Sequence, residues 1–181
     1  MTGRVNLAVR VATALCGAML ALCASAHSAS DSYLTLDTQE RAGTAGGGDT
    51  VIRAQWDVAL RDLHFVLRLD EDGDGNITWG ELRRRQPELE RYVYPALRAS
   101  GDGKPCAIKP HRQAVSNHAD GAYAAFFFDI VCAGAPRRLT LDYRLLFAID
   151  PSHRGILLFR SGGTTATSLF APEHATIDIK L

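Results

Sequence analysis

Apolar and polar residues alternate along much of the chain, and this period of two predicts β-strands. Residues 31–38 place Leu34 and Leu36 on one face and Tyr33 and Thr35 on the other. Later segments repeat this alternation or are apolar on both faces. These further predicted strands are residues 51–60, 123–132, 139–149, 155–161, 164–170 and 175–181. Several short strands separated by turns predict a mainly β fold, an Ig-like antiparallel β-sandwich.

The period changes to that of an α-helix between residues 61 and 98. The apolar stripe of a short first helix consists of Leu60, Leu63, Phe65, Val66 and Leu67. A second helical pattern starts at Trp79 and contains Pro87, which breaks a helix interior but suits a first helical turn. We therefore expect two helices, residues 79–86 and 87–98, or one sharply kinked helix. The whole helical segment is predicted to be an insertion between strands of the sandwich.

The loop between these helices matches the calcium-binding loop of an EF-hand at every defined position of D-x-[DN]-x-[DN]-G-x₅-E. The predicted ligands, at loop positions 1, 3, 5, 7, 9 and 12, are Asp70, Asp72, Asp74, Asn76, Thr78 and Glu81. Ca²⁺ takes six to eight oxygen atoms at about 2.3–2.6 Å, and Glu81 would supply two of them. Asn76 would bind through its backbone carbonyl, and Thr78 directly or through a water molecule. Gly75 stands where the chain must turn sharply.

An Asp/Gly-rich surface turn that binds nothing is the alternative interpretation of this loop. It contains no Lys or Arg that would balance its acidic groups. Their mutual repulsion would destabilise an ordered loop without a cation, so metal binding is the favoured interpretation. The only other Gly/Asp cluster, at Gly101-Asp102-Gly103, lacks the ligands. A lone loop of this kind predicts an affinity of about 10⁻⁴–10⁻³ M, typical of extracellular modules, or slightly tighter.

Residues 1–26 have the pattern of a Sec-type signal peptide. Arg4 and Arg10 provide a basic start, an apolar run too short to span a bilayer follows, and an A-x-A cleavage site ends at Ala26. The mature chain is then predicted to be residues 27–181, one domain located in the periplasm or secreted. No later apolar run reaches the roughly 18 residues of a membrane span, so no transmembrane segment is expected after cleavage.

The charge balance argues against a nucleic-acid partner. The whole chain carries 20 Lys and Arg residues against 20 Asp and Glu residues. Removing residues 1–26 takes away Arg4 and Arg10 and no acid, which leaves 18 against 20 and a net charge of −2. Such a chain has no electrostatic footprint for nucleic acid or for an anionic membrane surface.

Two cysteines, Cys106 and Cys132, remain after cleavage. In an oxidising compartment they predict one structural disulfide. Their spacing is not the C-x-x-C of a redox or metal motif, so we expect a bridge that only stabilises the fold.

Two rival sites deserve comparison with the acidic loop. Cleavage after Ala26 would make His27 the N-terminal residue, whose amine and imidazole suit Cu²⁺ or a nickel ion. A distant histidine would complete such a site, and the candidates are His64, His111, His118, His153 and His174. Asp150, Ser152 and His153 also lie together, but members of a nucleophilic triad normally come from distant segments. No nucleophile elbow, phosphate loop or dinucleotide motif occurs, and we expect no enzyme.

Four segments together resemble a known family. They are His27-Ser-Ala-Ser-Asp-Ser-Tyr-Leu34, Gln55-Trp-Asp-Val-Ala-Leu-Arg-Asp-Leu63, Ile77-Thr-Trp-Gly-Glu-Leu82 and Asp142-Tyr-Arg-Leu-Leu-Phe-Ala-Ile-Asp-Pro-Ser-His-Arg-Gly155. The set resembles bacterial exported proteins with a single EF-hand, soluble companions of the nickel-permease-like accessory membrane proteins of hydrogenase and urease clusters. The resemblance implies calcium binding and export, and a membrane or periplasmic protein as partner. It implies no reaction, and Pro87 and Pro95 depart from the family pattern.

Overall fold

The computed structural model describes residues 30–38 and 48–181. The predicted signal peptide and His27 lie outside these residues. Ten strands occur in the described part: β1 (Asp31–Asp37), β2 (Thr50–Ala59), β3 (Leu97–Gly101), β4 (Lys104–Pro105), β5 (Ala107–His118), β6 (Gly121–Cys132), β7 (Arg138–Tyr143), β8 (Arg154–Ser161), β9 (Thr164–Phe170) and β10 (Thr176–Lys180).

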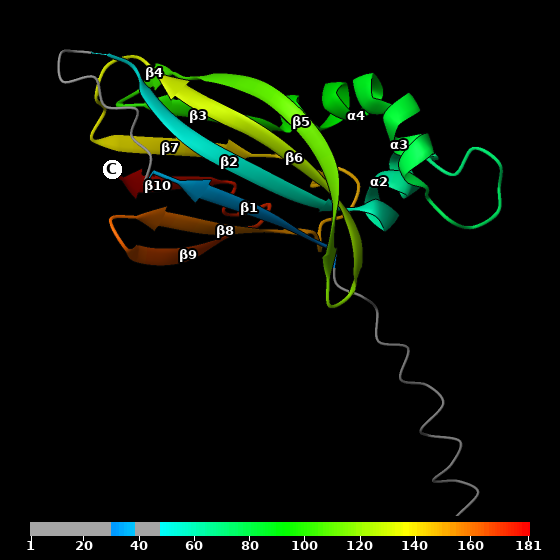
Figure 1. Ribbon diagram of the computed structural model, residues 1–181. Coiled ribbons are helices and arrows are strands. Elements are labelled where there is room, and N and C mark those ends of the chain that lie inside the picture. Colours follow the sequence, from blue (N-terminus) through cyan, green and yellow to red (C-terminus); the bar gives the residue numbers. More distant parts are fainter. Residues whose placement is uncertain (1–29, 39–47) are drawn as a thin grey trace, which may run out of the picture.

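The strands form two sheets (Figure 1). One has six strands in the order β5-β6-β2-β1-β8-β9, and the other has four in the order β10-β7-β3-β4. All pairings are antiparallel except that of β1 with β8. The prediction of a mainly β protein built as a β-sandwich is therefore confirmed, with one parallel pair that the alternating pattern did not indicate.

The core lies between the two sheets. Leu34 and Leu36 of β1 are fully buried, as their alternation with Tyr33 and Thr35 predicts. They belong to one hydrophobic cluster with side chains from the four-stranded sheet, including Leu141. Burial of such side chains, at about 25 cal/mol per Å² of apolar surface, is the main force that holds the sheets together.

A helical segment joins β2 to β3 at one end of the sandwich (Figure 1). It consists of α2 (Leu60–Leu67), α3 (Trp79–Arg84), α4 (Gln86–Val93) and the 3₁₀ turn η2 (Tyr94–Ala96). Pro87 lies in the first turn of α4, so the predicted division of the second helical pattern is confirmed. The prediction that this helix continues to residue 98 was wrong. Pro95 cannot donate to the helical ladder, and the next residues pair with β7 as strand β3.

Two apolar residues that pattern alone placed in the core are exposed. Phe65 of α2 is 75% exposed, so it does not belong to the buried stripe of that helix. The predicted strand 139–149 ends at Tyr143, and Ile149 is 45% exposed. The chain turns after Tyr143, where the Ile149 and Asp150 amides both bond to the Leu146 carbonyl at 2.8 Å and Leu146 takes a left-handed conformation with φ 62°. This loop buries Leu146 but turns Ile149 outward.

The predicted disulfide between Cys106 and Cys132 is present. It joins the residue before β5 to the end of β6, so it closes the open end of the β5–β6 hairpin. In the chain-entropy description a bridge over this separation contributes roughly 3–4 kcal/mol. Such bridges are common in exported proteins. Among the described residues no helix has the length and apolarity needed to cross a membrane.

Candidate metal site and a buried polar network

The acidic loop leaves the end of the sandwich between α2 and α3 (Figure 1). Helix α2 stops at Leu67 because Arg68 takes a left-handed conformation with φ 52°, and its amide bonds to the His64 carbonyl at 2.7 Å. Helix α3 begins after Thr78, which forms the predicted capping box with Glu81. Ile77 packs against the hydrophobic core and anchors the loop to the sandwich.

Three of the predicted ligands meet in this loop. Asp70, Asp72 and Asp74 each offer a carboxylate oxygen, and these oxygens lie within 4.8 Å of one another. The two oxygens of Asp70 accept the Gly73 and Gly75 amides at 2.8 and 2.9 Å. Both glycines have positive φ, 74° and 84°, which side-chain-bearing residues rarely adopt. The glycines therefore allow the tight turn that gathers the aspartates.

Glu81 does not belong to this group of three. Its Oε2 accepts the Thr78 amide and the Thr78 hydroxyl, both at 2.7 Å, and its Oε1 accepts the Glu71 amide at 2.8 Å. These hydrogen bonds, with that of the Thr78 amide the largest, lower the pKa of Glu81 to about 2. Glu81 is thus a buried carboxylate that ties the start of the loop to the start of α3.

The remaining predicted ligands are also engaged in the loop. The Asn76 amide donates to Asp74 Oδ1 at 2.7 Å, and the Thr78 hydroxyl is bonded to Glu81. The structure thus brings together Asp70, Asp72 and Asp74, and it leaves Glu81 and Thr78 paired with each other.

The charges around the loop are unevenly compensated. Glu71, which occupies a position that is not a ligand in the motif, pairs with Arg84 at 2.8 Å. In the described part of the chain no ion pair involves Asp70, Asp72 or Asp74. The three gathered carboxylates therefore repel one another without a protein cation beside them.

The chain matches no protein-family model and no curated protein. The family resemblance noted in the sequence therefore stays a prediction, and the chemistry of the sites must be argued from their residues.

The rival copper or nickel site cannot be placed, because His27 lies outside the described residues. Of its candidate partners, His111 pairs with Asp129, and His118 pairs with Asp57. Within residues 30–38 and 48–181, the aspartate group is the only cluster of three or more His, Cys, Asp or Glu side chains that could hold a metal ion.

The Asp150, Ser152 and His153 neighbours do not form a triad. The Ser152 hydroxyl donates to Asp150 at 2.6 Å, whereas the His153 ring is fully buried and bonded elsewhere. His153 therefore is not placed to activate Ser152.

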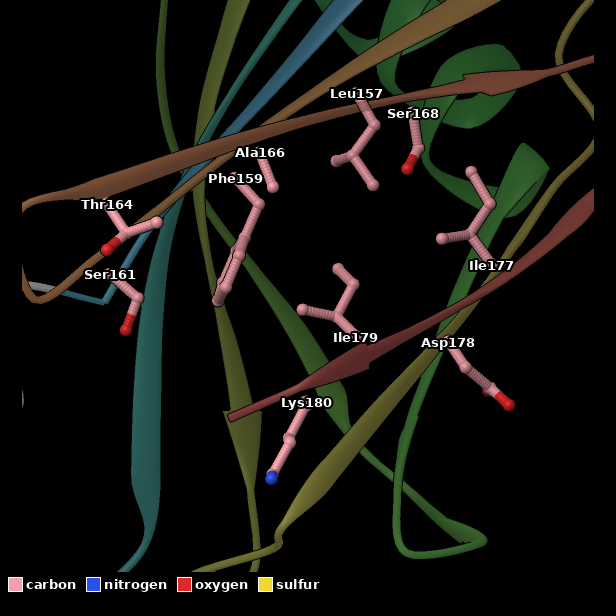
Figure 2. A pocket seen from close by; sticks show the side chains of 10 residues that line it. All are labelled: Leu157, Phe159, Ser161, Thr164, Ala166, Ser168, Ile177, Asp178, Ile179 and Lys180. Carbon is pink, nitrogen blue, oxygen red and sulfur yellow. The ribbon is translucent and has the colours of Figure 1, made fainter.

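An apolar groove lies between β8, β9 and β10, where the two sheets end (Figure 2). Leu157, Phe159 and Ile179 point into it, and Asp178 points away. Its polar lining consists of the hydroxyl residues Ser161, Thr164 and Ser168 and the charged residues Asp178 and Lys180.

Sequence reasoning missed a buried polar network on the opposite side of α2 from the acidic loop. His153 bonds to Ser30 through Nδ1 and to Tyr143 through Nε2, each at 2.7 Å. Tyr143 bonds to Ser32 at 2.7 Å. A signal did exist, because Ser30 and Ser32 share the inward parity of Leu34 in a strand whose inner face is otherwise apolar.

Proposed function

We propose that this chain is an exported, non-enzymatic Ca²⁺-binding module with a single EF-hand. The observation that carries the proposal is the convergence of Asp70, Asp72 and Asp74, with oxygens within 4.8 Å and no ion pair to a protein cation among the described residues. A hard cation with oxygen ligands is the partner that such a group of carboxylates suits best.

The two flanking helices give the ion a structural task. Asp70 lies just beyond the end of α2, and Glu81 lies in the first turn of α3. An ion held by both would connect the two helices and supply the positive charge that the loop lacks. Ca²⁺ would then stabilise the helical segment against the sandwich.

Glu81 would have to exchange partners when it binds the ion. Both of its oxygens already accept hydrogen bonds, two of them from Thr78. We expect Ca²⁺ to replace at least one of these bonds, since the motif requires two oxygens of this residue. The backbone amides of Glu71 and Thr78 are therefore the probes whose NMR shifts should report metal binding at Glu81.

Thermal unfolding tests the proposal. At 10 mM CaCl₂ and an affinity of about 10⁻⁴ M, mass action predicts a stabilisation of about 2.7 kcal/mol relative to EDTA. The same concentration of MgCl₂ should stabilise less, because Mg²⁺ demands a stricter geometry and keeps its water. Asp72→Asn should lose most of the calcium effect. Equal melting temperatures with Ca²⁺ and EDTA would contradict the proposal.

Export and partnership are separate parts of the proposal, supported by the signal-peptide pattern and the family resemblance. N-terminal sequencing of the chain recovered from a periplasmic fraction should begin at His27. A chain that begins at Met1 and stays in the cytoplasm would contradict export but not calcium binding. The module would act by binding a membrane or periplasmic protein.

A further inference from the structure

The buried polar network forms one continuous chain of hydrogen bonds that ends at a carboxylate. Its six members, in order of contact, are Trp56, Ser32, Tyr143, His153, Ser30 and Asp62. The contacts are 3.3 Å at the Trp56 end, 2.7 Å at the three middle steps and 2.9 Å from Ser30 to Asp62. Five of the six residues are buried, and Asp62 is half-buried at the end of the chain.

The Asp62 end and a neutral His153 fix the direction of every bond in this chain. An ionised Asp62 can only accept, so Ser30 donates its one hydrogen to Asp62 and must accept from His153 Nδ1. Burial lowers the pKa of His153 to about 4, so its ring is neutral and Nε2 is an acceptor. Tyr143 therefore donates to His153 Nε2, and Ser32, which accepts from the Trp56 indole, donates to Tyr143. All donors therefore point toward Asp62, and aligned bonds of this kind strengthen one another.

Asp62 faces a cavity of about 420 Å³ between α2 and the loop that follows β7. The cavity is lined by Ser30, Arg61, Asp62, Phe65, Leu146, Ile149 and Asp150. Phe65 and Ile149, the two exposed apolar residues that departed from the predicted core, both lie on its walls. Exposed apolar side chains that gather around a cavity with a few polar groups are typical of a ligand site.

The charge in the cavity is net negative. Asp62 and Asp150 face it with one cation, Arg61. Arg61 lies 2.8 Å from Asp120 but 3.7 Å from Asp62, so its charge is directed mainly to Asp120. Burial raises the pKa of Asp62, although the Ser30 hydrogen bond and the Arg61 charge act to lower it. Hydrogen bonds from Ser152 lower the pKa of Asp150, which stays ionised.

We propose that this cavity binds a small organic cation, a primary ammonium group carried on an apolar body. The ammonium group would donate hydrogen bonds to Asp62 and Asp150, and the apolar body would lie against Phe65, Leu146 and Ile149. A bare Ca²⁺ ion suits this cavity poorly, since it takes six to eight oxygens and the walls here are largely apolar. An anion would meet two carboxylates.

The hydrogen-bond chain positions the site. It holds Ser30 and Asp62 from behind through buried residues, so the carboxylate is presented in one orientation before a ligand arrives. Such pre-organisation lowers the entropy cost of binding. The site is separate from the acidic loop, because α2 presents Asp62 and Phe65 to this cavity and His64 to the loop, where it accepts the Asp70 amide.

NMR titration of the isotope-labelled mature chain tests the proposal with three probes that share one apolar body. These are hexylammonium, hexanol and hexanoate. Hexylammonium should shift the Phe65 and Ile149 signals at the lowest concentration, hexanol should need a higher one, and hexanoate the highest. Asp150→Asn should weaken hexylammonium binding about tenfold or more, since hydrogen bonds to charged groups contribute about 1.5–3 kcal/mol. It should leave hexanol binding unchanged.

Two further variants keep the test independent of folding. Phe65→Ala removes an exposed side chain and should weaken both hexylammonium and hexanol. Asp178→Asn removes an exposed carboxylate from β10 and should change neither. Equal affinity for hexylammonium and hexanol, or shifts confined to residues 70–81, would overturn the proposal.

The direction of the hydrogen-bond chain is tested separately by the ¹⁵N chemical shifts of the His153 ring. These shifts should show a proton on Nδ1. A proton on Nε2 would contradict the predicted direction.

Discussion

The acidic loop and the buried network differ in how their polar groups are satisfied. The network is buried in the core, and each of its donors has an acceptor. The loop is largely exposed, and its three gathered aspartates are satisfied by backbone amides but not by any cation of the described chain. The hydrogen bonds of the network are thus satisfied within the fold, and only the carboxylate of Asp62 at its end faces a cavity. The loop instead gathers three carboxylates around one point without a protein cation.

Acid unfolding should show the largest effect in this comparison. Burial lowers the pKa of His153 from its ordinary value of 6.5 to about 4. The unfolded chain therefore binds a proton at higher pH than the folded chain, and stability falls as the pH drops from about 6.5 to 4. The pKa difference corresponds to roughly 3 kcal/mol. Denaturant unfolding in EDTA at a series of pH values measures this loss.

His153→Gln is the control for that titration, since it removes the ionisable ring. The variant should be less stable at every pH, but its stability should fall less between pH 6.5 and 4. Asp62 also titrates in this range, and its raised pKa makes the folded chain more stable as the pH falls. Because both chains contain Asp62, its contribution cancels when their pH profiles are compared. Parallel pH profiles for the two chains would show that His153 is not buried as a neutral ring.

Removal of one hydroxyl from the network should have the next largest effect. Tyr143→Phe leaves His153 Nε2 without a donor and the Ser32 hydroxyl without its acceptor. Leaving buried polar groups unsatisfied costs about 1–3 kcal/mol, which denaturant titration would detect. Calcium affinity should be unchanged, because Tyr143 belongs to the core and not to the loop. A fall in calcium affinity would show that the two regions are coupled.

A smaller effect is expected from the turn of the loop. Gly75→Ala places a Cβ on a residue with φ 84°, where an L-residue is strained by roughly 1–2 kcal/mol. The same variant should also bind calcium more weakly, because the Gly75 amide donates a hydrogen bond to the Asp70 carboxylate. Gly80→Ala is the matched change within helix α3, where alanine is favoured by about 1 kcal/mol. Calorimetry that finds the two variants equally affected would contradict the role of this turn.

The smallest effect should come from the ion pair beside the loop. Arg84 and Glu71 lie 2.8 Å apart, but both side chains are at least a third exposed. Exposed pairs contribute about 0–1 kcal/mol, so Arg84→Gln should change the unfolding free energy by less than about 0.5 kcal/mol. A larger loss would mean that this pair fixes the loop geometry.

The two regions also differ in how far the sequence predicts them. The loop, the capping box of Thr78 with Glu81 and the break at Pro87 are local, so the spacing of a few residues defines each of them. Gathering of Asp70 with its neighbours follows from glycines that lie within the same loop. A pattern of this kind can be recognised without knowledge of the fold.

The network joins residues that are far apart in the chain. Ser30 and His153 are 123 positions apart, and Ser32 and Tyr143 are 111 positions apart. The pairing of β1 with β8, the one parallel pair in the described sheets, brings Ser30 beside His153. Packing of the two sheets brings Ser32 of β1 against Tyr143 of β7. The alternation of apolar residues predicts which face of each strand points inward, but it does not predict which strands lie side by side. For the same reason it did not predict that the chain turns after Tyr143 and exposes Ile149.

Calorimetric Ca²⁺ titration of Glu81→Gln beside Glu71→Gln tests the central claim most directly. Both changes remove one negative charge from the same loop, but only Glu81 occupies a ligand position of the motif. We predict one equivalent of Ca²⁺ for the unchanged chain and for Glu71→Gln, and no measurable binding at millimolar Ca²⁺ for Glu81→Gln. Equal binding by the two variants would reduce the loop to a diffuse acidic patch, and no heat from the unchanged chain would contradict a calcium site altogether.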